Sequence, residues 1–484
     1  MSFSKNKLSY ILLTLSIFLL LFIFYKSEIF FSGEKRDYYN TYYFLSFLFI
    51  LVSLLSLFLS NKLKVYFNII IVTLFLGIYL IEISIYIYKQ AYVTKIQKTA
   101  EKEPDQRKIN YEKETGKKYD DRSKYEVYLE AKNQNPNTVV AVHPHYFAKY
   151  KELSIYDILP LSGISNSPTI LCNENGYFSS YESDRYGFNN PDEVWDSDET
   201  EFLIIGGSYT NGSCVNRPHD MASVLRTVSN KNVITAGMGG SGPLLQLASL
   251  REYYNPSIKN VIWIYYDFNL LDLNNELNYP STILKNYLND DTYSQNLANK
   301  QKLIDEMGLK AIEFGINKDK EAALNQKIQI EKVLTALKNE TLATKLLKIL
   351  KLHNIRKQLL YTSFEENSYP EEEFKLILRK AKKITEENNA NFYLVFLPTH
   401  QRYLSNLSSI MYDFKYELYP KVKKISEELD INFIDLHKDF LDKQSNYREL
   451  LPLGIDGHFN INGYKKITEF IYNSIQTNQK KEQF

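Results

Sequence analysis

The stretch that decides the fold is Glu201-Phe-Leu-Ile-Ile-Gly-Gly-Ser-Tyr-Thr-Asn-Gly212. Its apolar run from Phe202 to Ile205 is typical of a buried parallel strand. Two glycines follow, which allow the backbone to turn sharply and other groups to come close, and Ser208 comes next. The pattern predicts a strand that delivers a serine to the carboxyl edge of a sheet, where open α/β sheets bind ligands. A plain strand-end turn has the same composition, so the serine alone establishes no activity.

Strands and helices alternate on both sides of a long interruption in the C-terminal part of the chain. We expect strands at 202–205, 232–235, 260–266, 392–397 and 431–436, and helices at 221–228, 244–254, 372–387, 420–429 and 463–475. Five strands that alternate with helices indicate a parallel sheet covered on both faces. With right-handed crossovers, the fold class is a doubly wound, three-layer α/β/α sandwich.

The first 89 residues indicate a membrane anchor. Three apolar runs, 8–25, 42–60 and 65–88, are each long enough to cross a bilayer. Glu82 lies inside the third run, and we expect its side chain to reach the interface. Lysine and arginine occur on both sides of the three spans, so the positive-inside rule leaves the topology open.

The remaining chain divides into a charged juxtamembrane linker at 90–137, a small β preamble at 138–200 and a main domain at 201–484. A helical insert at 274–370 interrupts that domain. Within the insert, 342–360 predicts a basic amphipathic helix, which either lies on a membrane surface or caps the sheet, and we favour the cap. The net charge of +1 gives no indication of a nucleic-acid partner.

The two cysteines, Cys172 and Cys214, are compatible with a disulfide and equally with two unrelated buried thiols. A bridge would brace the loop after Ser208 and would favour an oxidising compartment. No cofactor or metal is expected, because no Cys/His cluster occurs and the glycine-rich turn after the second strand matches neither nucleotide fingerprint. We expect His143 and His145 at the surface.

Acyl transfer by a serine requires a base, a group that orients the base, and donors for the oxyanion. His458 follows Asp456 in Asp-Gly-His, just before the last helix, so the carboxylate could fix the imidazole tautomer or be a simple turn residue. Gly240 and Asn269 follow the second and third strands and are the candidate oxyanion donors. His400 and Arg402 follow the fourth strand and are candidates for contact with substrate.

In this order, Gly206-Gly-Ser208, Gly240, Asn269 and Asp456-Gly-His458 resemble the four blocks of the SGNH (GDSL-like) hydrolase superfamily. The resemblance implies a flavodoxin-like fold with Ser208 as nucleophile, His458 as base and Asp456 as its orienting group. It also implies an oxyanion hole made of the Ser208 and Gly240 backbone N–H groups and Asn269. The stretch 242–253 resembles membrane-anchored bacterial members.

The sequence departs from the pattern of this family in three places. Gly207 stands where the family usually has aspartate, and Asp267 and Leu270 replace the usual Gly and Asp around Asn269. The last block is Asp-x-His, a form that resembles the branch acting on envelope polysaccharides. None of these departures removes a reacting group.

We therefore expect a membrane-anchored serine esterase that removes a small O-acyl group, such as acetyl, from a cell-envelope glycan or glycolipid. The expected location is the bacterial inner membrane, with the catalytic domain in the periplasm. One alternative is an O-acyltransferase that acts on an envelope polysaccharide with a partner acyl-donor protein in the membrane. Another is a non-catalytic envelope binding protein.

Overall fold

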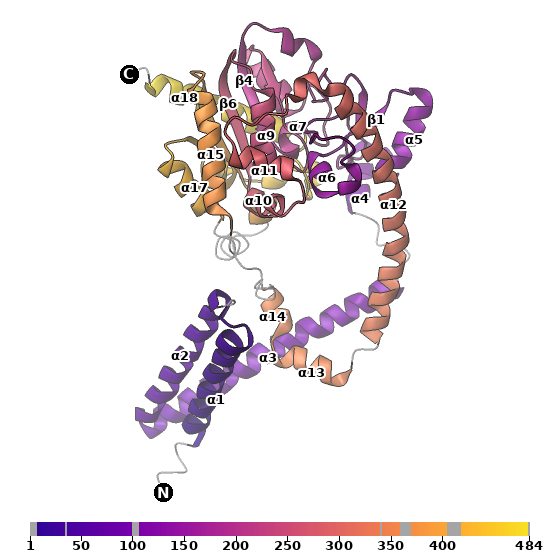
Figure 1. Ribbon diagram of the computed structural model, residues 1–484. Helices are drawn as coiled ribbons and strands as arrows, with labels where there is room; N and C mark the ends of the chain where they lie inside the picture. The colour runs from indigo at the N-terminus through magenta and orange to yellow at the C-terminus, as the bar shows by residue number, and fades with distance from the viewer. Residues whose placement is uncertain are drawn as a thin grey trace. The chain divides into compact units, whose positions relative to one another are not determined.

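The computed structural model describes residues 7–33, 36–98, 106–338, 341–358, 369–403 and 418–482 of the chain. It divides into two compact units (Figure 1). The anchor unit comprises Met1–Glu103 and Gln329–Ser368, and the α/β unit comprises Pro104–Ile328 and Tyr369–Phe484. The end of the predicted amphipathic stretch, 359–360, and the linker residues 99–105 lie outside the described residues.

The anchor unit contains three helical stretches that are long and apolar enough to cross a membrane: Ser9–Phe30, Tyr38–Phe58 and Asn61–Tyr88. The first consists of α1 (Lys7–Phe24) and a π-helical turn at Tyr25–Phe30, and the others belong to α2 (Arg36–Phe58) and α3 (Asn61–Lys98). Many of their large apolar side chains are exposed, as a lipid-facing helix requires.

Two short helices of the predicted insert, α13 (Leu342–Leu350) and α14 (His353–Gln358), pack on α3. Rather than extending alone toward the interface, Glu82 is buried and accepts hydrogen bonds from the backbone N–H groups of Asn354 and Ile355, both at 2.8 Å. The expectation that the helix at 342–360 caps the sheet is therefore wrong for α13 and α14, because both helices belong to the anchor unit.

The α/β unit is built on a five-stranded parallel sheet with the order β5-β4-β6-β7-β8. The strands are β4 (Thr200–Gly206), β5 (Val233–Thr235), β6 (Ile258–Tyr266), β7 (Asn391–Leu397) and β8 (Asn432–Asp435). In chain order this arrangement is 2-1-3-4-5, the flavodoxin-like form of the doubly wound fold. The fold class predicted from the sequence is confirmed.

The alternation of side chains along β4 explains why helices cover both faces of the sheet. Leu203 and Ile205 pack into one apolar core, and Phe202 and Ile204 into the other. The first core is covered by α9 (Pro243–Tyr253), α15 (Glu371–Glu386) and α17 (Leu418–Glu428), and the second by α8 (Met221–Ser229) and α18 (Ile461–Glu482).

The segments that precede the sheet pack against the α/β unit. The predicted preamble forms a small three-stranded sheet of β1 (Val139–Val140), β2 (Pro168–Ile170) and β3 (Ser180–Glu182), preceded and interrupted by α5 (Lys124–Gln134) and α6 (Pro144–Lys149). The linker residues from Gln106 to Thr115 form helix α4, which lies in the same unit.

The insert begins inside the α/β unit. After α10 (Asn269–Leu277), the helices α11 (Thr282–Asn289) and the first part of α12 (Gln301–Lys338) add Leu284, Tyr287, Ile304 and Met307 to the core on the α9 face. This first part of the insert therefore covers one face of the sheet, while α13 and α14 do not.

Candidate active site

Ser208 lies at the carboxyl end of β4, as the sequence predicts. It is the first residue of the short helix α7 (Ser208–Asn211), and Gly207 precedes it with φ −93° and ψ −140°. The side chain of Thr210 fills the space beside two glycines: a Cβ atom on Gly206 would lie 2.7 Å from it and one on Gly237 only 1.8 Å. The glycines therefore let α7 sit directly against the turn that follows β5.

His458 comes from the loop before α18 and meets the serine. Its Nε2 lies 2.8 Å from Ser208 Oγ, although the two residues are 250 positions apart in the sequence. The ring also packs against Tyr209, with centroids 4.9 Å apart. Ser208 and His458 are both partly exposed, so the hydrogen-bonded pair lies at the surface of the α/β unit rather than in its core.

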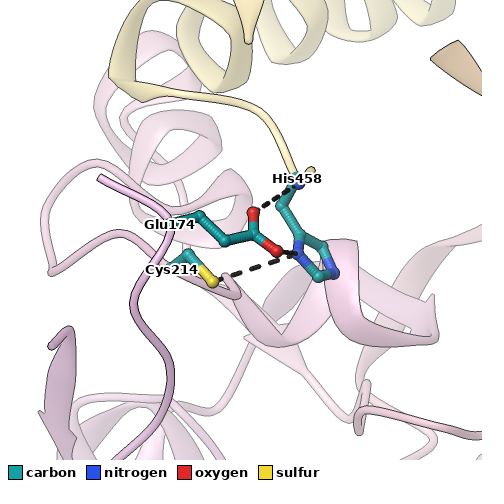
Figure 2. A group of neighbouring side chains, drawn as sticks. All are labelled: Glu174, Cys214 and His458. Atoms are coloured by element: carbon teal, nitrogen blue, oxygen red, sulfur yellow. Dashed lines mark hydrogen bonds and ion pairs between the residues drawn. The ribbon is translucent and has the colours of Figure 1, made fainter. Parts of the chain in front are cut away.

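The carboxylate that contacts the imidazole is Glu174, a residue that the sequence analysis did not identify. Glu174 Oε1 lies 3.0 Å from His458 Nδ1, and Oε2 accepts the backbone N–H of His458 at 2.6 Å (Figure 2). With a carboxylate at Nδ1, that nitrogen carries the proton, and the lone pair of Nε2 faces Ser208.

The expected pairing of Asp456 with His458 is not what the structure contains. Asp456 Oδ1 accepts a hydrogen bond from Arg107 Nη2 at 2.7 Å, and the same guanidinium nitrogen donates to the Asp456 carbonyl at 2.7 Å. The Asp456 side chain is 58% exposed, and the hydrogen bond with Arg107 lowers its pKa. Only one residue separates Asp456 from His458, and the chain turns the carboxylate away from the ring, toward helix α4.

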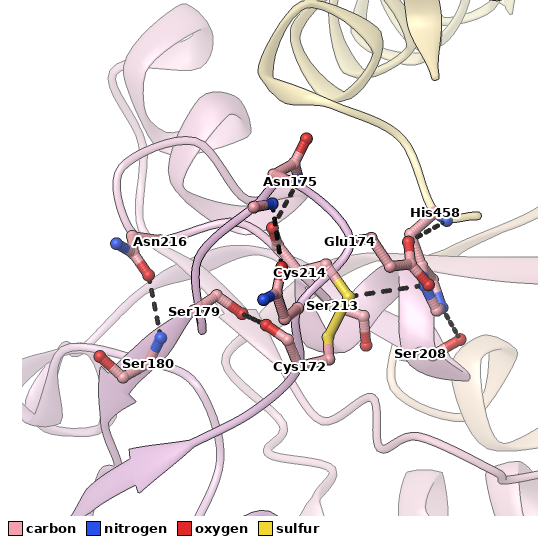
Figure 3. The surroundings of a disulfide bond; sticks show 12 residues. Cys172, Glu174, Asn175, Ser179, Ser180, Ser208, Ser213, Cys214, Asn216 and His458 are labelled. Carbon is pink, nitrogen blue, oxygen red and sulfur yellow. Dashed lines mark hydrogen bonds and ion pairs between the residues drawn. A yellow bond between two sulfur atoms is a disulfide. The ribbon is translucent and has the colours of Figure 1, made fainter. Parts of the chain in front are cut away.

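A disulfide joins Cys172 and Cys214, whose Cα atoms are 5.0 Å apart (Figure 3). It connects the loop that carries Glu174 to the loop that follows Ser208. Cys214 Sγ lies 3.9 Å from His458 Nδ1, so the bridge borders the imidazole. Because this sulfur is bonded to another sulfur, the cluster of Glu174, Cys214 and His458 has no thiolate to offer a metal ion.

Opposing effects set the charge state of Glu174. Burial raises the pKa of its carboxyl group, but hydrogen bonding and charge attraction to His458, together with the charge of Arg107, outweigh burial. The net result is a pKa below the usual value. Glu174 is therefore ionised near neutral pH and presents a full negative charge to the imidazole.

The three predicted oxyanion donors lie in different local settings. Gly240 has φ +71°, and a Cβ atom there would lie 2.2 Å from the His145 ring. Asn269 opens α10 and is buried; its Oδ1 accepts the Tyr266 N–H at 2.7 Å and its Nδ2 donates to Asp272 at 3.1 Å. The oxyanion roles of Ser208, Gly240 and Asn269 stay predictions.

His143 and His145 are both partly exposed, and their rings lie against the glycine turn. A Cβ atom on Gly239 would lie 2.5 Å from His143, and the two imidazoles stack with centroids 5.9 Å apart. Burial lowers the pKa of His143 to about 3 and that of His145 to about 4. Both rings are therefore neutral at physiological pH.

The two predicted substrate contacts have different outcomes. His400 is partly exposed after β7; burial lowers its pKa, and the nearby carboxylates of Asp456 and Glu174 act in the opposite direction. Arg402 has a side chain with no exposed surface, in an ion pair with Asp267. This ion pair joins the segments that follow β6 and β7 and gives Asp267 a structural role, and it leaves Arg402 no exposed surface for the predicted substrate contact.

A clue to Glu174 was present in the sequence. Glu174 lies two residues after Cys172, and Cys214 lies six residues after Ser208. If the cysteines had been taken as paired, Glu174 would have been expected near the serine. The loop Asn173-Glu-Asn-Gly176 instead has the composition of an ordinary turn, and Asp456 lies closer to His458 in the chain.

No family model matches this chain, and no curated protein matches its sequence. Among solved structures, it is similar to a G-D-S-L family protein from Desulfitobacterium hafniense DCB-2, with 14% identity and a TM-score of 0.29 over 57% of this chain and 99% of that one.

Two further structures are similar over the same extent. A psychrotrophic esterase from Pseudoalteromonas sp. has 10% identity and a TM-score of 0.28, over 58% of this chain and 100% of that one. A lipase/acylhydrolase from Enterococcus faecalis has 14% identity and a TM-score of 0.29, over 58% of this chain and 96% of that one. These values are low, so the assignment of the site rests on the geometry described above.

Proposed function

We propose that this chain is a membrane-anchored serine esterase of the SGNH type, which removes a small O-acyl group, such as acetyl, from a cell-envelope glycan or glycolipid. The observation that carries the proposal is the 2.8 Å contact between Ser208 Oγ and His458 Nε2 at the carboxyl edge of the sheet. A nucleophile and a base within hydrogen-bond reach are the signature of covalent acyl transfer.

The proposed reaction proceeds through an acyl-enzyme. His458 Nε2 accepts the proton of Ser208 as the oxygen attacks the acyl carbon, and the same proton passes to the departing sugar oxygen. A water molecule, activated by the same imidazole, then releases the acyl group. The backbone N–H groups of Ser208 and Gly240 and the side chain of Asn269 are the proposed donors to the negative oxygen.

The surroundings of the Glu174 loop support a polar substrate. A cleft of about 470 Å³ lies beside this loop and is bordered by His143; its lining does not include Ser208 or His458. Its lining is largely charged or polar: Lys108, Tyr119, Asp120, Asp121, Arg122, Lys124, His143, Leu171, Cys172, Asn173 and Phe178. Charged side chains with a few aromatic rings suit a hydrated glycan better than a long acyl chain. His400 is the remaining candidate for substrate contact.

The proposed location is the bacterial inner membrane, with the α/β unit in the periplasm. Three helices long and apolar enough to span a membrane support anchoring. The disulfide supports an oxidising compartment for the α/β unit, because such bonds are rarely stable in a reducing cytoplasm.

A fluorophosphonate probe, which reacts with activated serines, tests the proposal on the full-length protein in detergent. Wild type should be labelled, and Ser208→Ala and His458→Ala should lose the label while retaining the wild-type circular dichroism spectrum. A well-folded wild type that takes no label would favour a non-catalytic binding protein instead.

Product analysis distinguishes hydrolysis from transfer. With an O-acetylated glycan as substrate, an esterase releases acetate whether or not a second glycan is present. A transferase, the alternative that needs a membrane partner carrying the acyl donor, would place the acetyl group on the added glycan. Release of free acetate at an unchanged rate in the presence of the acceptor is the expected result.

A further inference from the structure

We infer that Glu174 is the positioning carboxylate of this site, supplied by the preamble and held in place by the disulfide, and that Asp456 does not have that role. The inference rests on the proposed function, because a positioning residue acts only through the base that it orients. It replaces the assignment implied by the Asp-x-His motif with one based on the observed contacts.

The first argument is the bidentate contact. Glu174 binds His458 at two points, with one oxygen at the ring nitrogen and the other at the backbone N–H, at 3.0 and 2.6 Å. Two simultaneous hydrogen bonds fix both the rotation of the ring and the position of the loop that carries it. A single contact at Nδ1 would leave the loop free to carry the ring away from Ser208.

The second argument is that Asp456 already has a partner. The guanidinium of Arg107, on helix α4, donates to both its side chain and its carbonyl at 2.7 Å. Nearby, Asn110 on the same helix donates to the Leu453 carbonyl at 2.9 Å. These contacts attach α4 to the outside of the His458 loop, so the Asp456 carboxylate serves loop attachment rather than imidazole orientation.

The third argument is that the Glu174 loop is fixed from several sides. The disulfide precedes Glu174 by two residues, and the Asn175 side chain donates to the Cys214 carbonyl at 2.8 Å (Figure 3). Gly176 has φ +89° and lies so close to Tyr111 that a Cβ atom would be 2.2 Å from the ring. A loop held in this way can position a carboxylate as firmly as a strand end would.

The test compares matched variants of the full-length protein in detergent by the rate of labelling with a fluorophosphonate. Glu174→Gln keeps the shape of the side chain but removes the charge, Glu174→Asp keeps the charge at a shorter reach, and Asp456→Asn makes the same neutralisation at the other carboxylate. We expect Glu174→Gln to label about 10²- to 10⁴-fold more slowly, as loss of a triad carboxylate does elsewhere. Glu174→Asp should recover part of that loss, and Asp456→Asn should stay within about tenfold of wild type.

The NMR spectrum adds a readout that a purely structural role would not change. A downfield Nδ1–H proton resonance in the NMR spectrum should be present in wild type and Asp456→Asn and absent in Glu174→Gln.

The outcomes separate this inference from the proposed function. Labelling of wild type but not of Ser208→Ala supports the esterase. If, in addition, Glu174→Gln is labelled as fast as wild type and Asp456→Asn is labelled slowly, the assignment to Glu174 is overturned while the esterase stands. If wild type takes no label, or Ser208→Ala is labelled equally, the proposed function fails and the role of Glu174 fails with it.

Discussion

At the scale of single residues, Gly457 lies beside His458 and leaves space for the Glu174 carboxylate to approach the His458 backbone. It has φ +129°, and a Cβ atom built on it would lie 2.5 Å from Glu174 Oε2. Only glycine therefore lets Glu174 reach the His458 backbone N–H. The Gly in Asp-Gly-His is explained by this close approach.

A Gly457→Ala substitution should accordingly lower the fluorophosphonate labelling rate, by about a hundredfold if the imidazole shifts by an ångström. Gly454→Ala is the matched control, because Gly454 lies in the same loop with φ +70° but has open space around its Cα. Both variants place an alanine at a positive φ, and only the first displaces Glu174. Equal losses of activity in the two variants would contradict this explanation.

The half-buried imidazoles of His143 and His145 predict a dependence of stability on pH. The pKa values of His143 and His145 fall from 6.5 to about 3 and about 4, so the folded state binds fewer protons than the unfolded state below pH 6.5. Stability is therefore fully present above pH 6.5 and falls as the pH decreases toward 4. Between pH 7 and pH 5 the two residues together should cost up to about 4 kcal/mol.

Urea denaturation of the full-length protein at pH 7 and pH 5 measures this difference, with tryptophan fluorescence as the signal. The double variant His143→Gln/His145→Gln should be less stable at pH 7 but should lose less stability on acidification. An equal loss in variant and wild type would place the responsible groups elsewhere.

At the scale of elements, the disulfide connects the loop after α7 to the loop of Glu174. Reduction should free the Glu174 loop and slow labelling by about tenfold or more. The same loss is expected of the Cys172→Ser/Cys214→Ser variant. The chain-entropy model assigns a bridge of sequence separation 42 a stabilisation of about 4 kcal/mol, so folding is checked by circular dichroism.

The variant Glu174→Gln shows whether the bridge acts through Glu174. If it does, dithiothreitol should slow wild type strongly and should change the low residual rate of Glu174→Gln little. If dithiothreitol instead lowers the labelling rate of Glu174→Gln by the same factor as that of wild type, the disulfide supports the site by another route, such as the position of α7.

A second pair of elements, α3 and α14, is joined by Glu82 within the anchor unit. Its carboxylate accepts two backbone N–H groups and the Asn354 side chain at 2.8–2.9 Å. In Glu82→Gln an amide N–H2 group would face these donors, so the hydrogen bonds that hold α14 on α3 would be weakened. Trypsin should then cleave at the lysines of the adjacent helix α13 about tenfold faster in detergent micelles. Ser84→Ala is the control, because Ser84 is exposed on the same helix and its hydroxyl donates to the Leu80 carbonyl. Equal cleavage rates in the two variants would mean that Glu82 does not hold α14.

At the scale of the whole molecule, the proposal that all three apolar helices cross the membrane puts the two ends of the chain on opposite sides of it. With the α/β unit in the periplasm, alkaline phosphatase, which requires an oxidising compartment, should be active when fused at Gly33 or after the last residue and inactive when fused at Asn61. The opposite pattern would place the α/β unit in the cytoplasm and would remove the support for an envelope substrate.

The sequence by itself determined the order of strands and helices, the three apolar spans and the meeting of Ser208 with His458. These follow from local periodicity and from a general rule that the carboxyl ends of parallel strands share one edge. Each predicted strand of the five-stranded sheet matches an observed strand to within two residues at either end. The strands, helices and spans depend on neighbouring residues, whereas the meeting of Ser208 with His458, 250 positions apart, was expected from the order of the motifs along the chain.

Only the tertiary structure decided which groups surround that pair. Glu174 meets His458 across 284 positions, Arg402 after β7 forms a buried ion pair with Asp267 after β6, and α13 and α14 join the anchor unit through Glu82. Asp456, two residues from His458, is the carboxylate that proximity in sequence favours, but the backbone directs it to Arg107. The reason is physical: a side chain's partner is set by where the folded backbone points it, and contacts between distant segments leave no local pattern in the sequence.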